Sequence, residues 1–82
     1  MKRFLNMTIA TPEGVIFEGE VESAEFPSTL GAFTLLPLHA ALISSLTEGQ
    51  IVYVKDGKPE KVAIKGGFVE VKQDIVSVCV EQ

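Results

Sequence analysis

Histidine and cysteine are nearly absent from this 82-residue sequence, which contains one of each, His39 and Cys79. A single cysteine excludes an internal disulfide, and nothing in the composition indicates an oxidising compartment. One histidine and one cysteine, far apart in the chain, supply too few ligands for a Cys/His metal cluster. With 46% hydrophobic residues, the sequence therefore predicts one small domain that folds around a hydrophobic core.

Long apolar runs are also absent. No segment approaches the roughly 18–20 apolar residues that a membrane-spanning helix needs. The first three residues include two basic ones, but the residues after them alternate in polarity instead of forming the apolar block of a signal peptide. We therefore expect a soluble, cytoplasmic protein without direct membrane insertion.

Cations are missing from a large part of the chain, because no Lys or Arg occurs between Phe4 and Val54. The net charge of −4 argues against a nucleic-acid partner. The acidic residues of the cation-free segment are Glu13, Glu18, Glu20, Glu22, Glu25 and Glu48. They are interpreted either as a solvated strand face or as a surface complementary to a basic partner.

Short strand signals, separated by turn residues, run through the whole sequence and predict an all-β sandwich or barrel. Leu5, Met7 and Ile9 alternate with more polar residues, as expected for a strand with one buried face. The segment Thr11–Gly14 suits a type I turn, with proline second and glycine fourth.

Three glutamates, Glu18, Glu20 and Glu22, alternate with less polar residues in the second predicted strand, so all three are expected on one face. The apolar residues that follow are shifted by one position. A β-bulge near Glu22 or Ser23 would explain this change of face.

The uncharged segment Gly31–Ile43 is the most distinctive stretch of the chain. We predict a strand over Ala32–Leu36 that ends before Pro37, because proline has no N–H to donate to a ladder. Phe33 and Leu35 share one face of this strand and are predicted to be core residues.

The remaining elements are also predicted as strands. Residues 38–46 fit helical spacing as well as strand alternation, and their short length and β neighbours favour a strand. Lys55–Lys58 carries the Asp-Gly signal of a tight hairpin. A sharp bend is expected at Gly66-Gly67, after which Phe68–Lys72 pairs with Ile75–Val80.

Candidate catalytic groups are few. His39 has no Gly-flanked serine or other evident nucleophile as a partner, and Cys79 falls at the outward parity of the last strand. The neighbouring glutamates of the second strand lack the contrasting environments that an acid–base pair requires. We therefore predict a non-enzyme without cofactor or metal, in which His39 is a structural or interface residue.

Three motifs follow one another in a specific order. They are Thr11-Pro12-Glu13-Gly14, then Gly31-x-Phe33 with Leu35-Leu36-Pro37-x-His39-Ala40 and Leu42-Ile43, and last Gly66-Gly67-Phe68-x-Glu70-Val71. Together they resemble the N-terminal domain of the epsilon subunit of F-type ATP synthases, whose mitochondrial counterpart is called delta. The resemblance runs from about Leu5 to Val80, and its most specific part is the Leu-Pro-x-His-Ala segment.

This resemblance implies a flattened antiparallel β-sandwich of about ten short strands, forming a single domain over residues 1–82. It implies a non-catalytic rotor subunit of the central stalk that couples the gamma subunit to the c-ring of a proton-translocating, ATP-synthesising complex. It also implies a peripheral position at the cytoplasmic face of a bacterial cell membrane. Because no C-terminal helical domain follows the sandwich, neither self-inhibition nor ATP binding is expected.

The resemblance also implies two groups of contact residues. The gamma-subunit interface would comprise Thr11, Leu38, His39, Ala40, Ala41, Leu42, Ile43 and Ser44. The c-ring-facing loop would comprise Ser28, Thr29, Leu30, Gly31 and Ala32. Leu38 departs from the family pattern, since a glycine or small polar residue is usual there.

A biotinyl- or lipoyl-type carrier domain is the alternative, because such domains are also small acidic β-sandwiches. They carry a modifiable lysine on a tight hairpin, and Lys55 and Lys58 flank Asp56-Gly57. The hydrophobic residues that usually bracket the modified lysine are absent after Lys58. Intact mass would distinguish the two functions.

Overall fold

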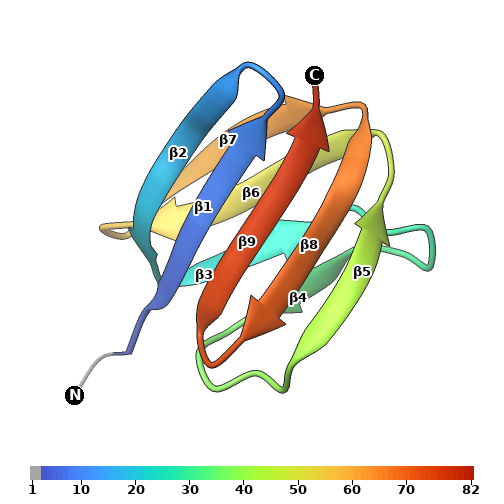
Figure 1. The fold of residues 1–82 in the computed structure, drawn as a ribbon. Coiled ribbons are helices and arrows are strands. Elements are labelled where there is room, and N and C mark those ends of the chain that lie inside the picture. The colour runs from blue at the N-terminus through green and yellow to red at the C-terminus, as the bar shows by residue number, and fades with distance from the viewer. Residues whose placement is uncertain (1–2) are drawn as a thin grey trace.

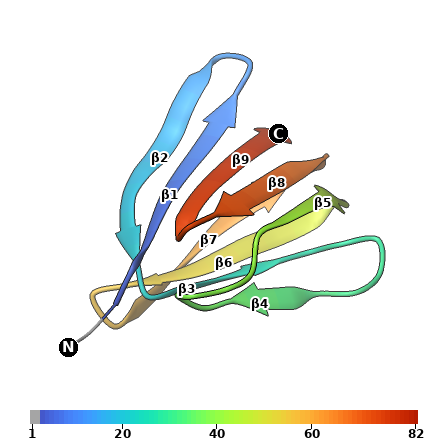
Figure 2. The same ribbon diagram turned by 60° about the horizontal axis from the view of Figure 1, so that its bottom comes forward.

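The computed structural model describes residues 3–82, which form nine strands in two sheets (Figure 1). The strands are β1 (Leu5–Thr11), β2 (Gly14–Val21), β3 (Ser23–Phe26), β4 (Phe33–Leu35), β5 (Leu42–Leu46), β6 (Gly49–Lys55), β7 (Lys58–Ile64), β8 (Gly66–Lys72) and β9 (Ile75–Glu81). One sheet has the order β2-β1-β9-β8-β5 and the other β4-β3-β6-β7. The two sheets pack face to face, which confirms the predicted β-sandwich (Figure 2).

Nearly all neighbouring strands are antiparallel, and the exception is the pair β1–β9 at the centre of the five-stranded sheet. These two strands run parallel, with Asn6 in register with Ile75 and Ala10 with Cys79. The first and last strands of the chain therefore lie side by side (Figure 1).

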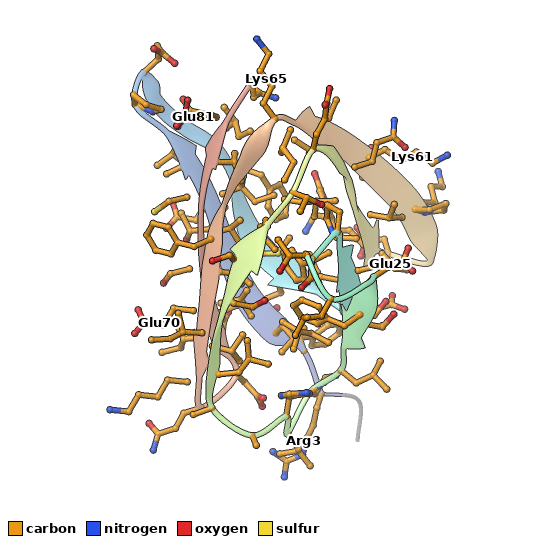
Figure 3. All side chains as sticks on the ribbon, turned by 90° about the vertical axis from the view of Figure 1, so that its right-hand side faces the viewer. Arg3, Glu25, Lys61, Lys65, Glu70 and Glu81 are labelled. Carbon is orange, nitrogen blue, oxygen red and sulfur yellow. The ribbon has the colours of Figure 1, made fainter. Side chains whose placement is uncertain are left out.

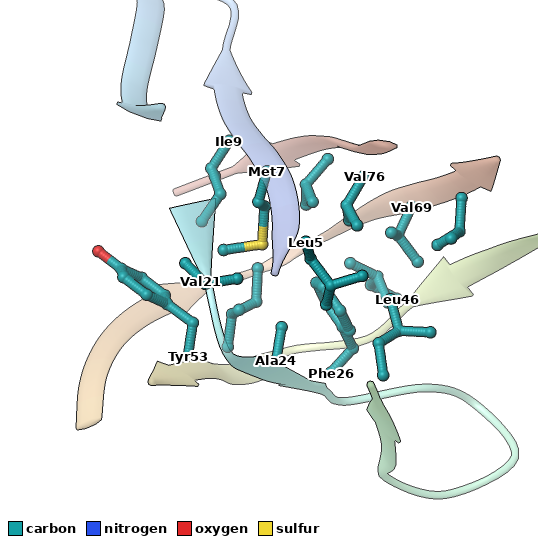
Figure 4. Close-up of a cluster of buried hydrophobic side chains, with 14 of the residues drawn as sticks. Leu5, Met7, Ile9, Val21, Ala24, Phe26, Leu46, Tyr53, Val69 and Val76 are labelled. Carbon is teal, nitrogen blue, oxygen red and sulfur yellow. The ribbon is translucent and has the colours of Figure 1, made fainter. Parts of the chain in front are cut away.

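The core lies between the sheets and is built by strand alternation. Leu5, Met7 and Ile9 of β1 are buried while Asn6 is exposed, as the alternation predicted. Their side chains meet those of the four-stranded sheet, such as Phe26 (Figure 4). Burial of one side chain of this size contributes about 1.5–3 kcal/mol, so this layer supplies most of the stability.

The shifted parity after Glu22 has a different origin from the bulge that the sequence suggested. β2 ends at Val21 in one sheet, and β3 begins at Ser23 in the other. The chain crosses between the sheets at Glu22, and the buried face changes because the strand changes sheets. The register shift of this region lies instead between Ile9 and Ala10, where β1 pairs with β2.

Glu22 is consequently not aligned with the two preceding glutamates. Its Oε2 accepts a hydrogen bond of 3.0 Å from the backbone N–H of Gly57, in the turn between β6 and β7. Glu18 and Glu20 lie on the exposed face of β2, so the expectation of three carboxylates on one face is wrong for Glu22.

The glycine pair at 66–67 forms the start of β8 rather than a separate bend before it. Gly67 has a φ of +149°, and a Cβ atom there would overlap the carbonyl oxygen of Cys79 on the neighbouring strand. Glycine is needed at this position because the backbone of β9 approaches so closely.

The segment with the proline also follows its prediction closely. β4 covers residues 33–35, within the predicted 32–36, and Leu35 is fully buried. Phe33 is half-buried and its ring centroid lies 5.6 Å from that of Phe26. Residues 42–46 form strand β5, which confirms a strand for this part of the ambiguous segment, whereas residues 38–41 belong to the loop before it.

Charged side chains occupy both outer faces of the sandwich. Glu70 of β8 points away from the five-stranded sheet, and Glu25 of β3 and Lys61 of β7 point away from the four-stranded sheet (Figure 3). The acidic residues of the first half of the chain are therefore divided between two faces, and they do not form one continuous surface.

Candidate interaction surface

The two most reactive side chains, the imidazole of His39 and the thiol of Cys79, lie on different elements. His39 is exposed in the loop that joins β4 and β5, and its Nδ1 lies 2.7 Å from the carbonyl oxygen of Ala40. Cys79 is an exposed free thiol on β9. Among residues 3–82, no three His, Cys, Asp or Glu side chains gather in a way that could hold a metal ion.

The β4–β5 loop (residues 36–41) exposes two leucines. Leu36 and Leu38 are 58% and 70% exposed, although leucine is usually buried. Leu38 has a φ of +69°, a left-handed conformation that glycine adopts without cost.

The β4–β5 loop is held by the turn between β8 and β9. The backbone N–H of Leu38 donates a hydrogen bond of 2.7 Å to Oδ1 of Asp74. The backbone carbonyl of Asp74 in turn accepts a hydrogen bond of 2.8 Å from the N–H of Asn6. Leu38, His39 and residues 72–74 line a hollow of about 580 Å³ beside this contact.

The β3–β4 loop (residues 27–32) projects beyond the strands at one edge of the sandwich (Figures 1 and 2). Ser28 shapes it, because its carbonyl oxygen accepts from Gly31 N–H at 3.0 Å and its Oγ from Leu30 N–H at 3.2 Å. The carbonyl oxygen of Pro27 accepts a hydrogen bond from Thr47 N–H, just after β5. The side chain of Leu30 at the tip is 98% exposed.

A second hollow, of about 330 Å³, lies between the β3–β4 loop and β5. Its lining residues are Ser28, Leu30, Gly31, Ala32, Phe33, Leu42, Ile43 and Ser44. Sequence reasoning assigned residues 28–32 and 42–44 to two different contacts, whereas the structure brings them together around one hollow. Ile43, which is 73% exposed, is the large apolar side chain on the β5 side.

Thr11 is separated from the other residues of its predicted group. It ends β1, and its Oγ1 donates a hydrogen bond of 3.2 Å to the carbonyl oxygen of Gly14. Ala10, the preceding residue, is in register with Ser45 of β5 across three strand spacings of roughly 4.8 Å each. Thr11 therefore does not lie beside His39 or Ile43.

Sequence reasoning missed three residues of this surface, Leu36, Lys72 and Asp74. Leu36 was placed at the end of a strand, but it follows β4 and is exposed. Lys72 and Asp74 line the larger hollow, although they lie more than thirty positions from Leu38. The turn signal at Gln73-Asp74 was visible in the sequence, but nothing local showed which loop this turn would contact.

The hairpin of the alternative carrier domain has the wrong arrangement for its role. Lys55 and Lys58 pair with each other at the ends of β6 and β7, and Asp56 and Gly57 occupy the turn itself. Neither lysine is at the tip. The structure therefore gives the carrier interpretation no support.

The described part of the chain is an all-β sandwich in which Leu30, Leu36, Leu38 and Ile43 are exposed at two neighbouring loops and strand β5. Other apolar side chains, among them Val15, Ile16, Phe68 and Ile75, are exposed on β2, β8 and β9. Within residues 3–82, no helix is long and apolar enough to cross a membrane. The fold thus defines the class as a small two-sheet β-sandwich domain.

The family of the chain follows from comparison with known proteins. Residues 4–82 match the sequence profile of the ATP synthase delta/epsilon chain β-sandwich domain, and the chain belongs to this family. The ATP synthase epsilon chain of Nitratiruptor sp. is 44% identical over 78 residues, covering 94% of this chain and 60% of that protein. The epsilon chain of Wolinella succinogenes is 46% identical over 79 residues, covering 95% of this chain and 59% of that protein.

A solved structure shows the same fold. A chain in the structure of the Euglena gracilis mitochondrial ATP synthase, which contains OSCP, F1 and the c-ring, superposes with a TM-score of 0.91 at 20% identity. The match covers 96% of this chain and 51% of the other. The sequence thus spans about 60% of the length of the curated relatives described above.

Proposed function

We propose that this chain acts as the β-sandwich domain of an epsilon-type subunit in the rotor of an F-type ATP synthase. In this role it is non-catalytic, binds no cofactor, and couples the gamma subunit to the c-ring during proton-driven ATP synthesis. It would act at the cytoplasmic face of a bacterial cell membrane as part of the complex. The observation that carries the proposal is the family match, which extends over the whole sandwich.

The proposed gamma contact is centred on the β4–β5 loop and the start of β5. The proposal draws support from the exposure of Leu38 and Ile43, because exposed apolar side chains in a cluster are typical of interaction sites. His39 lies next to Leu38 and is exposed as well. We retain residues 38–44 in this contact and leave Thr11 out of it, since it lies three strands away.

The proposed c-ring contact is the tip of the β3–β4 loop. Its support is the nearly complete exposure of Leu30 on a loop that is shaped by internal hydrogen bonds. Because this loop and β5 line one hollow, the gamma subunit and the c-ring would approach the domain at adjoining positions. A contact surface on hydrogen-bonded elements is stiff, as the transmission of torque requires.

Binding to the gamma subunit of the same organism tests the first contact. Leu38→Asp and His39→Asp are expected to weaken binding by roughly tenfold or more, because a carboxylate would be desolvated within an apolar contact. Val15→Asp is the matched control, since Val15 is 60% exposed on β2 at a distance from the proposed site. Binding that both site variants leave unchanged would contradict the proposal.

The second contact is tested with a purified gamma–c-ring complex. Leu30→Asp is expected to weaken association with this complex by roughly tenfold, and to leave affinity for isolated gamma within about twofold. His39→Asp should reduce both affinities. If Leu30→Asp affected neither measurement, residues 28–32 would not be the c-ring contact.

A further inference from the structure

The left-handed conformation of Leu38 needs an explanation, because a branched side chain disfavours it. The other non-glycine residues with positive φ are Asp56, Gln73 and Asp74, and all three lie in two-residue turns between adjacent strands. There the tight hairpin geometry itself requires positive φ. Leu38 is the second residue of the turn at Pro37-Leu38, where a proline followed by a positive φ matches a type II turn, and its N–H is free to bond outside the loop.

The carboxylate of Asp74 anchors this turn to another part of the sandwich. Its Oδ1 accepts the 2.7 Å hydrogen bond from the N–H of Leu38, a partner 36 positions away in the sequence. Asp74 itself is fixed, because it occupies the β8–β9 turn and its carbonyl oxygen accepts the N–H of Asn6 at the start of β1. The Asp74 side chain thus attaches the β4–β5 loop to the turn between β8 and β9, beside the start of β1.

We infer that Asp74 is the positioning residue that orients Leu38 and His39 for contact with the gamma subunit. The inference rests on the function proposed above and names a determinant of that site that does not itself belong to the loop. The Asp74 bond holds the Leu38 backbone in place, and the Leu38 side chain is 70% exposed at the rim of the larger hollow. Loss of the bond releases the loop and leaves both sheets intact.

Three variants separate this role from the other properties of Asp74. Asp74→Gly keeps the positive φ of 63° that the turn requires and removes the acceptor. Asp74→Asn also suits a left-handed turn position, keeps the Oδ1 acceptor and removes only the charge. Glu81→Gln removes a charge from the same strand pair at the end opposite to this turn, in register with Gly66, and serves as a control for long-range electrostatics.

The first measurement is hydrogen exchange of the Leu38 amide by NMR, in the chain without any partner. Asp74→Gly should accelerate this exchange by about tenfold or more, while Asp74→Asn leaves it within about threefold of the wild type. The amides of β9 should exchange at wild-type rates in both variants. Unchanged exchange of the Leu38 amide in Asp74→Gly would overturn the inference.

The second measurement is affinity for the gamma subunit. We expect Asp74→Gly to weaken binding by roughly fivefold to tenfold, with Asp74→Asn and Glu81→Gln within about twofold of the wild type. Equal losses in the Asn and Gly variants would indicate a charge effect and overturn positioning by Asp74. If the wild type binds gamma and all three variants bind equally well, the inference fails alone. If the wild type does not bind gamma, the proposed function fails.

Discussion

Gly67 illustrates how a single backbone position can control the packing of a sheet. Its missing side chain lets the β9 backbone approach, since a Cβ atom there would come within 2.8 Å of the Cα of Val80. Its neighbour Gly66 has no such restriction, because a Cβ atom would lie at an ordinary 3.6 Å from the carbonyl oxygen of Leu46. Two adjacent glycines therefore have different requirements.

Gly67→Ala is expected to lower the free energy of unfolding by about 3 kcal/mol, because it combines steric overlap with a strained φ. Gly66→Ala, the matched control, should change it by less than about 1 kcal/mol. Urea denaturation of both variants measures the difference. Similar stabilities of the two variants would contradict the assigned close approach at Gly67.

Leu35 and Leu36 form a second pair of neighbours with opposite environments, fully buried and 58% exposed. Leu35→Ala should cost about 3 kcal/mol of stability, because it leaves a cavity in the core. Leu36→Ala should cost less than about 0.5 kcal/mol. Thermal unfolding of the two variants tests the assignment, and a reversed order of stabilities would show that this strand has the other face inward.

Strand alternation was sufficient to predict the core at residue level, because a half-buried strand exposes every second side chain. Leu35 was identified in this way, as were Leu5, Met7 and Ile9, whereas Phe33 is only half-buried and packs against the core. The positive φ of Leu38 fits a turn that begins with Pro37, but the contact that anchors this turn could not be predicted from the chain alone. Asp74 makes this contact, and no local pattern connects two residues 36 positions apart.

At the level of elements, the crossing from β2 to β3 is where sequence reasoning failed. The sequence pattern looks the same in two cases: a β-bulge within one strand, and a chain that crosses from one sheet to the other. In both cases the side chains of the opposite parity become the buried ones. The hydrogen bond from Gly57 N–H to Glu22 Oε2 identifies the passage in the structure. It connects the crossing to the hairpin β6–β7 of the four-stranded sheet.

Glu22→Ala is expected to destabilise the domain by about 1 kcal/mol, because the Gly57 N–H loses a charged acceptor in a partly solvated position. Glu20→Ala removes an exposed glutamate from the end of β2, just before the crossing, and should have an effect within about 0.5 kcal/mol. Chemical denaturation quantifies both, and hydrogen exchange of the Gly57 amide should accelerate only in Glu22→Ala. An equal effect in the two variants would reject this role of Glu22.

The elements of the candidate site show the same limit. The resemblance identified the two loops, and turn residues such as Gly31 marked where they begin and end. The hollow lies between the β3–β4 loop of the four-stranded sheet and β5 of the five-stranded sheet, and local signals do not encode which elements of the two sheets come together. The order of the strands in the two sheets decides which loops lie side by side.

At the scale of the whole molecule, the two sheets are joined by aromatic packing as well as by aliphatic side chains. The ring centroids of Phe17 on β2 and Tyr53 on β6 lie 4.4 Å apart, across the sandwich. Burial, and to a smaller extent the negative charge of Glu60, raises the pKa of the Tyr53 phenol above its ordinary value. The ionised phenolate is therefore disfavoured in the folded state.

This shift predicts a loss of stability in alkaline solution. Because the unfolded chain releases the tyrosine proton first, the contribution of Tyr53 is fully present below about pH 10 and declines as the pH rises through the higher folded-state pKa. Urea denaturation between about pH 8 and 11 should show a steeper decline for the wild type than for Tyr53→Phe. Parallel declines would contradict the prediction. Phenolate absorbance provides a direct titration, since the chain has one tyrosine and no tryptophan.

The parallel pair β1–β9 has a consequence for the order in which the domain can fold. β1 is made first during synthesis, yet its partner in the centre of the five-stranded sheet begins at Ile75. Until β9 has left the ribosome, β1 and β8 each lack a neighbour, and the core face of β1 has no complete sheet around it. Pairing β1 with β9 closes a long loop of the chain. The entropic cost of this closure comes before the stabilising contacts form, and folding is therefore slow. The β1–β2 hairpin of the nascent chain therefore stays exposed until β9 has been made and completes the sandwich.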